Sequence, residues 1–469
     1  MNRRRIWAVR GLLWLLMLLP ALMLRLTIVH APRVATGDGL QYHQLAQILK
    51  TEHRFAYLPA PSPLTYTRLP GYPLFLALTQ PNQALPMEEH LVSATRANAL
   101  LDVGTAAVVA ALASQLGLGL FCQLFGFWAV ILMPTMFMLS TVGLCESLVT
   151  FLLTMATYLA VRTRGSDPSI RWLWVALAGL FLGLAQLVRV DSLLTIPAVL
   201  AVLGLTAASW RERWQSWVLC LGVAALCFAP WPLRNLRLFR AAHAGGSPWI
   251  DMAGQPLPMG MMRWYQTWAT GRIDGEGFHL MMVARHAPLS PYRPNIIMPA
   301  MYENEAERRV LVRLFEQYSR EGLSPAVDRM FYRLAARRLA ERPLRVLVTL
   351  PLIRLGTLWS PMPPYELSIH SKLLGLPQLL PLWNGFGSLL LLLSVAGACV
   401  ACFESDKRRW VLALLLVPLV RSVGFVYLHP IPLQRYFVEA MPVLLLFSGY
   451  ALSRLLRLWD GPPRSHPKA

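Results

Sequence analysis

Ionisable side chains stand at the ends of several apolar segments or inside them, where a charge is costly and therefore indicates function. Asp38 and Arg68 lie in the first polar stretch, Glu146 interrupts an apolar run, and Arg189 and Asp191 join two apolar segments. The same pattern includes Arg96, His429, Arg435 and Glu439. If the apolar segments cross a membrane, these side chains meet at one face, which predicts an active site or a polar pathway there.

Carboxylates and arginines at one site suit group transfer from a phosphate-linked donor. A carboxylate can remove the proton of an acceptor hydroxyl as the new bond forms, which contributes roughly 10²–10⁴-fold to the rate. Arginines can neutralise a departing phosphate in a site of low dielectric constant. Carboxylates alone would suit a proton-coupled transporter equally well, so the arginines favour phosphate chemistry.

Each candidate also has a structural alternative. Asp38 precedes an amphipathic stretch at 40–49 and can cap a helix N-terminus. Arg68 can reach the membrane interface from an apolar surface. Glu146 can pair with an arginine inside the protein, while Arg189 and Asp191 can neutralise each other.

The remaining candidates are weaker. Tyr42 lies one helical turn after Asp38 and can order the site. Its ring can equally well pack at a membrane interface and have no part in the site. Tyr72 belongs to the irregular segment Pro70-Gly71-Tyr72-Pro73, which a membrane tolerates only where it lines a cavity or is buried in protein. His429 can carry a second proton or only support the structure.

The composition is that of a polytopic membrane protein. The chain has 469 residues, 55% of them hydrophobic and 14% charged, with a mean hydropathy of +0.46. Soluble domains carry about 25% charged residues, so this composition excludes an ordinary cytosolic enzyme. The apolar content excludes a disordered chain.

Arginine dominates the net charge of +20, because only four of the 44 basic residues are lysines. Positive loops at the cytoplasmic face and phosphate recognition both explain this balance. The sequence contains no nucleic-acid-binding motif and no phosphate-binding glycine loop, so we expect neither a nucleic-acid partner nor a nucleotide donor.

About ten apolar segments are long enough for transmembrane helices. They lie near 6–29, 94–116, 118–138, 141–161, 172–189, 191–209, 214–232, 381–403, 409–428 and 436–456. The first resembles a signal peptide but lacks a clear cleavage site, so we expect it to be retained. The segment 344–360 carries Arg345 and Arg354 between two prolines, and we expect an interfacial or re-entrant helix there.

Arginine and lysine in short loops orient these segments. The loops carry Arg162, Arg164 and Arg171; Arg211 and Arg213; Lys407, Arg408 and Arg409; and Arg454 and Arg457. With these loops in the cytoplasm, residues 1–232 form an N-terminal transmembrane module whose first outer loop is 30–90. Residues 233–343 form an extracytoplasmic domain with arginine-rich helices near 303–321 and 325–341. Residues 344–469 supply the interfacial helix and the last transmembrane helices.

Five motifs follow one another along nearly the whole chain. They are RLTIVHAPRVATGDGLQYHQLAQ (25–47), RLPGYPLFLAL (68–78), GLAQLVRVDSLLTIP (183–197), APWPLRN (229–235) and QRYFVEAMP (434–442). Their order resembles that of the protein O-mannosyltransferases, family 39 of the glycosyltransferases. These enzymes belong to the glycosyltransferase-C superfamily, which includes the lipid-A aminoarabinose transferases.

The resemblance implies an all-α polytopic membrane protein with a glycosyltransferase-C-like fold, about ten transmembrane helices and a small outer domain. It implies transfer of a monosaccharide, with inversion, from a polyprenyl phosphate to an envelope acceptor (protein, lipid or glycan). Asp38 would be the catalytic carboxylate, and Glu146 would position the acceptor or a metal ion. Arg68, Arg189 and Arg435 would bind the lipid phosphate, and Tyr42, Tyr72, Asp191 and His429 would serve the acceptor or its positioning.

Two positions depart from the family pattern. Many relatives carry Asp-Glu where this chain has Asp38-Gly39, which argues against a bound metal ion, although a divalent metal stays open. The aminoarabinose transferases have Lys-Pro-Pro where this chain has Arg68-Leu69-Pro70, which argues against that acceptor.

The interpretation is therefore a glycosyltransferase of the bacterial inner membrane with its active site on the periplasmic side. Its partners would be the polyprenyl-phosphate-linked sugar, the envelope acceptor and membrane lipids. Two alternatives stay open: a lipid-linked glycan ligase or polymerase, which would not need Asp38, and a transporter or flippase. A transporter would be favoured by helix breaks paired across two halves, and the sequence has no such repeat.

Overall fold

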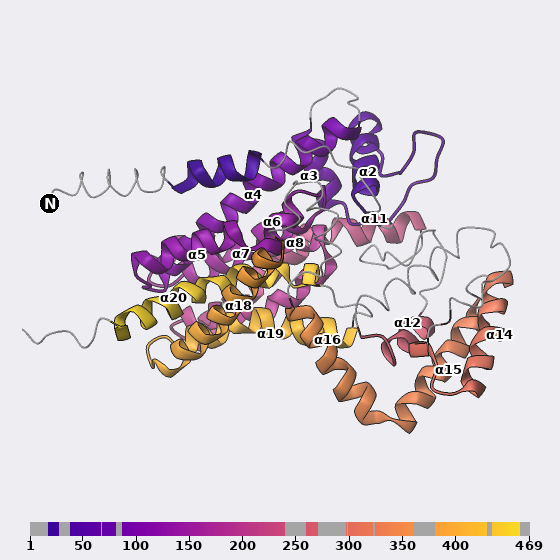
Figure 1. The fold of residues 1–469 in the computed structure, drawn as a ribbon. Helices are drawn as coiled ribbons and strands as arrows, with labels where there is room; N and C mark the ends of the chain where they lie inside the picture. The colour runs from indigo at the N-terminus through magenta and orange to yellow at the C-terminus, as the bar shows by residue number, and fades with distance from the viewer. Residues whose placement is uncertain are drawn as a thin grey trace, which may run out of the picture. The chain divides into compact units, whose positions relative to one another are not determined.

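The computed structural model describes residues 17–27, 38–66, 68–80, 87–239, 259–270, 297, 299–321, 324–360, 380–428 and 434–459. All regular structure in these ranges is helical, as expected for an all-α protein (Figure 1). The chain divides into two compact units. The first unit comprises Met1–Gly246, Pro361–Val420 and Val438–Ala469, and the second comprises Ser247–Ser360 and Arg421–Phe437.

The longer helices of the first unit overlap the predicted apolar segments, whereas α2 and α3 lie in the predicted outer loop. They are α2 (Asp38–Glu52), α3 (Gly71–Thr79), α4 (Met87–Gln115), α5 (Leu120–Leu132), α6 (Pro134–Ser140), α7 (Glu146–Arg162), α8 (Pro168–Val188), η1 (Val190–Thr195), α9 (Ile196–Thr206), α10 (Trp210–Phe228), α11 (Pro230–Phe239), α18 (Leu380–Phe403), η7 (Val438–Ala440) and α20 (Met441–Trp459). Helix α19 (Arg408–Leu428) begins in the first unit and ends in the second.

Six of the described helices are long and apolar enough to cross a membrane. Helices α5 and α6, bent by 54° at the break between them, form either a seventh, broken span or a re-entrant loop. Pro134 opens α6 and explains this bend, because proline interrupts the helical hydrogen-bond ladder. Two shorter apolar helices, Met17–Thr27 and Val190–Thr206, cover two more of the predicted spans, and α7 covers a third with 17 residues. The multi-pass architecture is thus confirmed, whereas the count of ten crossings stays a prediction.

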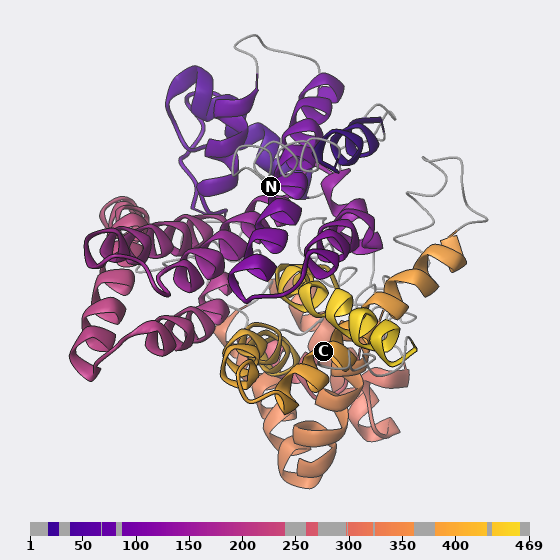
Figure 2. The same cartoon turned by 90° about the vertical axis from the view of Figure 1, so that its left-hand side faces the viewer.

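Neighbouring helices of the first unit pack side by side in both views (Figures 1 and 2): α4 against α5 and α7, α7 against α8, and α18 against α20. Small residues allow close approach where α8 meets α10. A Cβ on Gly179 would lie 2.3 Å from the carbonyl oxygen of Cys220, and one on Gly183 would lie 2.7 Å from that of Ala224. Glycines four residues apart are a common contact surface between transmembrane helices.

A buried ion pair joins the first apolar helix to α4. Arg25 Nη1 lies 3.2 Å from Asp102 Oδ2, and both side chains are almost fully buried. Arg25 also donates to Ser140 Oγ at 3.0 Å. Asp102 lies deep in an apolar helix, where a buried carboxylate requires a cation, and Arg25 supplies it from another helix.

The second unit contains α12 (Met259–Gln266), η3 (Pro299–Met301), α14 (Glu305–Glu321), α15 (Pro325–Glu341), η4 (Arg345–Thr349), α16 (Leu350–Trp359) and η6 (Gln434–Tyr436). Helices α14 and α15 confirm the two helices expected at 303–321 and 325–341. Trp264, Phe315 and Phe331 lie in their shared core. Arg338 is buried and binds both oxygens of Glu307 at 2.9 Å, while most of the other arginines on these two helices are exposed.

Candidate active site

Asp38 and Arg68 form an ion pair at an accessible edge of the first unit. Asp38 occupies the first turn of α2, where the helix dipole favours a negative charge. Arg68 precedes the Pro70-Gly71 entry to α3, and its Nε donates to Gln41 Oε1 at 2.8 Å. Asp38 is 37% exposed and Arg68 is 14% exposed, so solvent or a substrate reaches the carboxylate more easily than the guanidinium.

Two buried tyrosines lie beneath this pair. The Tyr42 ring is 5.4 Å from the Arg68 guanidinium carbon and 5.1 Å from the ring of Tyr72, edge to face. Burial, together with the neighbouring Cys145, raises the pKa of Tyr42 well above its ordinary value, so this phenol stays protonated. Tyr42 therefore holds the guanidinium in place and does not act as a base.

Hydrogen bonds connect the tyrosines to the start of α7. The Tyr42 hydroxyl lies 3.5 Å from Cys145 Sγ, directly before Glu146. Asn98 Nδ2 donates to the Tyr72 hydroxyl at 3.3 Å and to the Leu144 carbonyl at 3.1 Å. This network fixes the N-terminus of α7 relative to the Asp38–Arg68 pair.

Arg189 binds three carboxylates. Its Nε and Nη2 contact the two oxygens of Asp191 at 3.0 and 2.8 Å, a bidentate pair. Its Nη1 lies 3.4 Å from Glu146 Oε1, and its Nε lies 3.2 Å from Glu439 Oε1. Glu146 and Glu439 are buried, so a single guanidinium is the shared cation for carboxylates on α7, η1 and η7.

Helix α3 connects the Asp38–Arg68 pair to this cluster. A Cβ on Gly71 would lie 2.7 Å from the backbone carbonyl of Leu187, two residues before Arg189. Only glycine fits so close an approach. The second and third sequence motifs therefore pack directly against each other.

The fourth motif packs against the segment that leads to Arg68. Arg234 Nη1 donates to the Thr65 carbonyl at 3.2 Å, and its guanidinium lies 4.7 Å from the ring of Trp231. Trp231 in turn contacts Phe55 at 4.9 Å, edge to face. This motif supports the loop, and sequence inspection had assigned it no role.

The structure thus brings seven of the nine predicted site residues into the first unit: Asp38, Tyr42, Arg68, Tyr72, Glu146, Arg189 and Asp191. Arg435 belongs to the second unit, where its Nη2 donates to the Tyr436 hydroxyl at 3.0 Å. His429 lies outside the described residues. Glu439, which the sequence pattern includes without a specific role, also belongs to the site through its contact with Arg189. Gln41 is an additional member that sequence reasoning missed.

The acidic side chains fit a metal ion poorly. Within the described part of the chain, no three His, Cys, Asp or Glu side chains are placed to bind one cation together. Arg189 occupies the space between Glu146, Asp191 and Glu439, and its charge competes with that of a cation. We therefore derive no step that uses a metal.

The family comparison matches the N-terminal half of the chain. The model of the dolichyl-phosphate-mannose-protein mannosyltransferase family matches residues 15–239, which hold the first four motifs. This match confirms the resemblance that the motifs indicate. None of the curated proteins compared with the chain matches it.

Several solved structures share the fold. The apo oligosaccharyltransferase of Archaeoglobus fulgidus has a TM-score of 0.52 and 14% identity, over 94% of this chain and 51% of that one. The same archaeal protein, AglB, in complex with an inhibitory peptide and a dolichol-phosphate, has a TM-score of 0.51 and 14% identity, over 96% and 52%. The chain therefore spans about half the length of these oligosaccharyltransferases.

A further similarity is too weak to carry an argument. The ArnT protein of Cupriavidus metallidurans, bound to undecaprenyl phosphate, has a TM-score of 0.40 and 15% identity, over 96% of this chain and 77% of that one. The likeness to the archaeal structures shows an all-α membrane fold of the glycosyltransferase-C type.

Proposed function

We propose that the protein is a glycosyltransferase that uses a polyprenyl-phosphate-linked monosaccharide, because residues 15–239 match the model of the dolichyl-phosphate-mannose-protein mannosyltransferase family. The observation that carries this proposal is the Asp38–Arg68 ion pair. It joins a carboxylate that can accept a proton to a cation that can bind a phosphate, at an edge open to substrate.

The reaction balances with these two groups. The acceptor hydroxyl oxygen attacks C1 of the sugar and forms the new glycosidic bond. The bond between C1 and the phosphate oxygen breaks, and its electron pair leaves with the polyprenyl phosphate. Asp38 accepts the hydroxyl proton, and attack from the face opposite the phosphate inverts the configuration at C1.

Arg68 stabilises the negative charge that grows on the leaving phosphate. Its Nε and Nη2 are bound to Gln41 and Asp38, and no acceptor in the described ranges binds its Nη1, which can donate to a phosphate oxygen. The Tyr42 ring below the guanidinium fixes its plane. Such a preorganised donor acts where charge develops in the transition state.

Glu146, Asp191 and Arg189 act as positioning residues in this scheme. They fix the ends of α7 and α8 against η7, and they hold α3 and the Arg68 segment in place. Arg435, in the fifth motif, remains a candidate for contact with the phosphate. His429, which precedes that motif, remains a candidate for contact with the acceptor.

The charge pattern supports an active site on the outer side of a bacterial inner membrane. Arg162 ends α7 and Arg171 begins α8, whereas Glu146 begins α7 and Arg189 follows α8. Arginines of short loops stay in the cytoplasm, so the opposite helix ends, with the candidate site, face outward. The acceptor is then an envelope protein, lipid or glycan.

The test uses the purified full-length protein in lipid nanodiscs, with radiolabelled polyprenyl-phosphate sugars and an envelope extract as acceptor. We expect wild type to move label from the lipid to a new product. Asp38→Asn keeps the shape and hydrogen bonds of the side chain but cannot accept the proton, and we expect at least a hundredfold loss, on the order of a general base's contribution.

Asp167→Asn is the matched control, because Asp167 is exposed at the opposite end of the helices. It should leave transfer unchanged. Full transfer by Asp38→Asn would refute the role of Asp38. Transfer only from pyrophosphate-linked oligosaccharides would instead identify a glycan ligase.

A further inference from the structure

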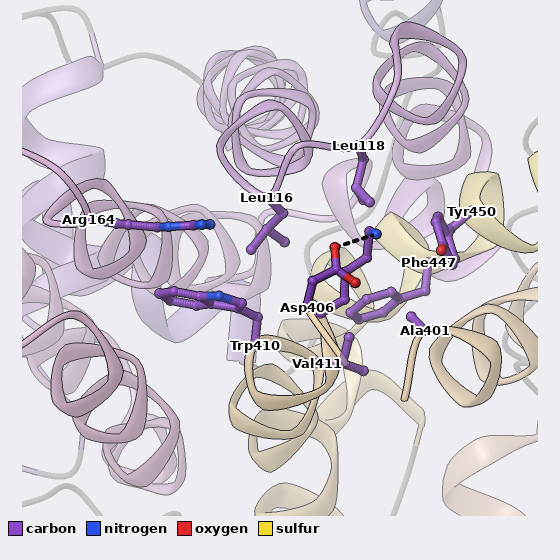
Figure 3. Close-up of a pocket in the computed structure, with 10 residues that line it drawn as sticks. Leu116, Leu118, Arg164, Ala401, Asp406, Trp410, Val411, Phe447 and Tyr450 are labelled. Atoms are coloured by element: carbon purple, nitrogen blue, oxygen red, sulfur yellow. Dashed lines mark hydrogen bonds and ion pairs between the residues drawn. The ribbon is translucent and has the colours of Figure 1, made fainter. Parts of the chain in front are cut away.

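A cleft of about 100 Å³ lies at the end of the first unit opposite Arg189, where the α4–α5 loop, the α7–α8 loop and the α18–α19 turn meet helices α18, α19 and α20 (Figure 3). Leu116, Leu118, Val411 and Phe447 are apolar side chains of its wall. The polar side chains that line it are Arg164, Asp406, Lys407, Trp410 and Tyr450. An apolar wall beside basic and aromatic groups is suited to an amphipathic ligand.

Arg164 supplies a positioned positive charge. Its guanidinium lies flat over the Trp410 ring, 5.0 Å from the ring centre (Figure 3). The Arg164 side chain is exposed, and no carboxylate in the described ranges forms an ion pair with it. Stacking on an indole holds a guanidinium in one orientation and leaves its N–H donors available to an anion.

Lys407 supplies the second positive charge. Its Nζ lies 2.7 Å from Glu404 Oε2 and 3.0 Å from Asp406 Oδ2. Asp406 is 71% exposed, so its side chain can turn into solvent when another anion approaches Lys407. Glu404 also accepts from Tyr450 and Arg454, which holds the α18–α19 turn against α20 and fixes Lys407 beside the cleft.

The position and the size of the cleft favour a lipid headgroup. Trp and Tyr are enriched where helices leave the hydrocarbon core, and basic pockets between such helices bind lipid phosphates. A volume of about 100 Å³ exceeds the ~10–15 Å³ that one water molecule needs in the same measure by several times, which leaves room for a phosphate. Helix α7 places about 25 Å between Glu146 and Arg162, so this cleft is separate from the candidate active site.

We propose that this cleft binds the phosphate of an anionic phospholipid, with Arg164 and Lys407 as its ligands. The lipid would connect the α7–α8 loop to the α18–α19 turn and strengthen their packing. This site does not depend on the proposed transferase activity.

The experiment is native mass spectrometry of the full-length protein with phosphatidylglycerol or phosphatidylcholine of identical chains. We expect the wild-type protein to retain phosphatidylglycerol in preference to phosphatidylcholine. Arg164→Gln and Lys407→Gln should each weaken that binding by about tenfold, as loss of one charge-assisted hydrogen bond predicts. Arg211→Gln is the matched control, because it removes an exposed arginine at the same end of the helices without touching the cleft.

Three outcomes would overturn the proposal. Equal binding of the two lipids would mean that the cleft does not select an anionic headgroup. Equal losses in Arg164→Gln and Arg211→Gln would mean that only the overall charge matters. If inorganic phosphate displaced phosphatidylglycerol and raised the unfolding temperature as much as the lipid does, the ligand would be a soluble phosphate compound.

Discussion

Arg189 Nε lies 3.2 Å from Glu439 Oε1, so the third sequence motif contacts the fifth although most of the chain's second half separates them. The same guanidinium binds Asp191 and Glu146. Three carboxylates around one cation make the arrangement depend on Arg189, because buried charges of one sign repel each other strongly.

Arg189→Met should therefore destabilise the protein severely. It leaves Glu146 and Glu439 buried without their cation, and removal of one partner of a buried pair costs about 3–5 kcal/mol. Asp191→Asn should cost much less, since Asp191 is partly exposed and two carboxylates still bind Arg189. Thermal unfolding of both variants in detergent checks this order. Comparable unfolding temperatures for the two would contradict it.

Arg68→Gln should lower transfer rather than stability. Loss of one donor that stabilises transition-state charge costs about 10²–10³ in kcat. Combined with Asp38→Asn, the effect should be far from additive, because the two residues act as one unit. Steady-state kinetics of the two single variants and the double variant measure this coupling. Independent effects on kcat would separate Arg68 from the reaction.

Gly71→Ala should reduce both stability and transfer. The new methyl group would meet the Leu187 carbonyl at 2.7 Å, which forces α3 away from α8 and shifts Arg68 relative to Arg189. Overpacking of this kind costs about 1–3 kcal/mol. Gly222→Ala is the matched control. Gly222 lies in α10, and no atom of the described part of the chain lies within 4 Å of the new methyl group, so the substitution should stabilise the helix slightly. Equal unfolding temperatures of the two variants would contradict the tight contact.

The sequence predicts the helices well because apolar length and charged ends are local features. The ends of α7 and α8 at Arg162 and Val188, and the two helices of the second unit, follow from such patterns. The sequence also indicates that Asp102 needs a cationic partner, since a buried carboxylate requires one. No local sequence pattern identifies that partner as Arg25.

The partners within the candidate site were less predictable. Arg189 and Asp191 are two residues apart, so their pairing was foreseen as an alternative. The contact of Arg189 with Glu439 depends on how η7 packs against α7, which no local pattern reveals. The close approach at Gly71 likewise depends on the path of α3 across α8. A glycine within a motif indicates a close contact but does not identify the segment that makes it.

His43 gives the structure a dependence on pH. Its side chain is buried in α2, its ring lies 4.4 Å from that of His90, and its Nδ1 has no hydrogen-bond partner among the residues that the structure describes. Burial, together with the neighbouring His90, lowers the pKa of His43 to about 4. In the unfolded chain, His43 binds a proton near pH 6.5, whereas in the folded protein it binds one only near pH 4.

Stability should therefore fall as the pH drops from about 6.5 to about 4, by at most about 1.4 kcal/mol per pH unit from this side chain. Unfolding midpoints of wild type and His43→Gln across this interval measure the contribution, and the variant should show the shallower decline. His53→Asn is the control, since His53 is exposed and asparagine tolerates its positive φ of 53°. Equal slopes for wild type and His43→Gln would mean that the folded protein protonates His43 as readily as the unfolded chain does.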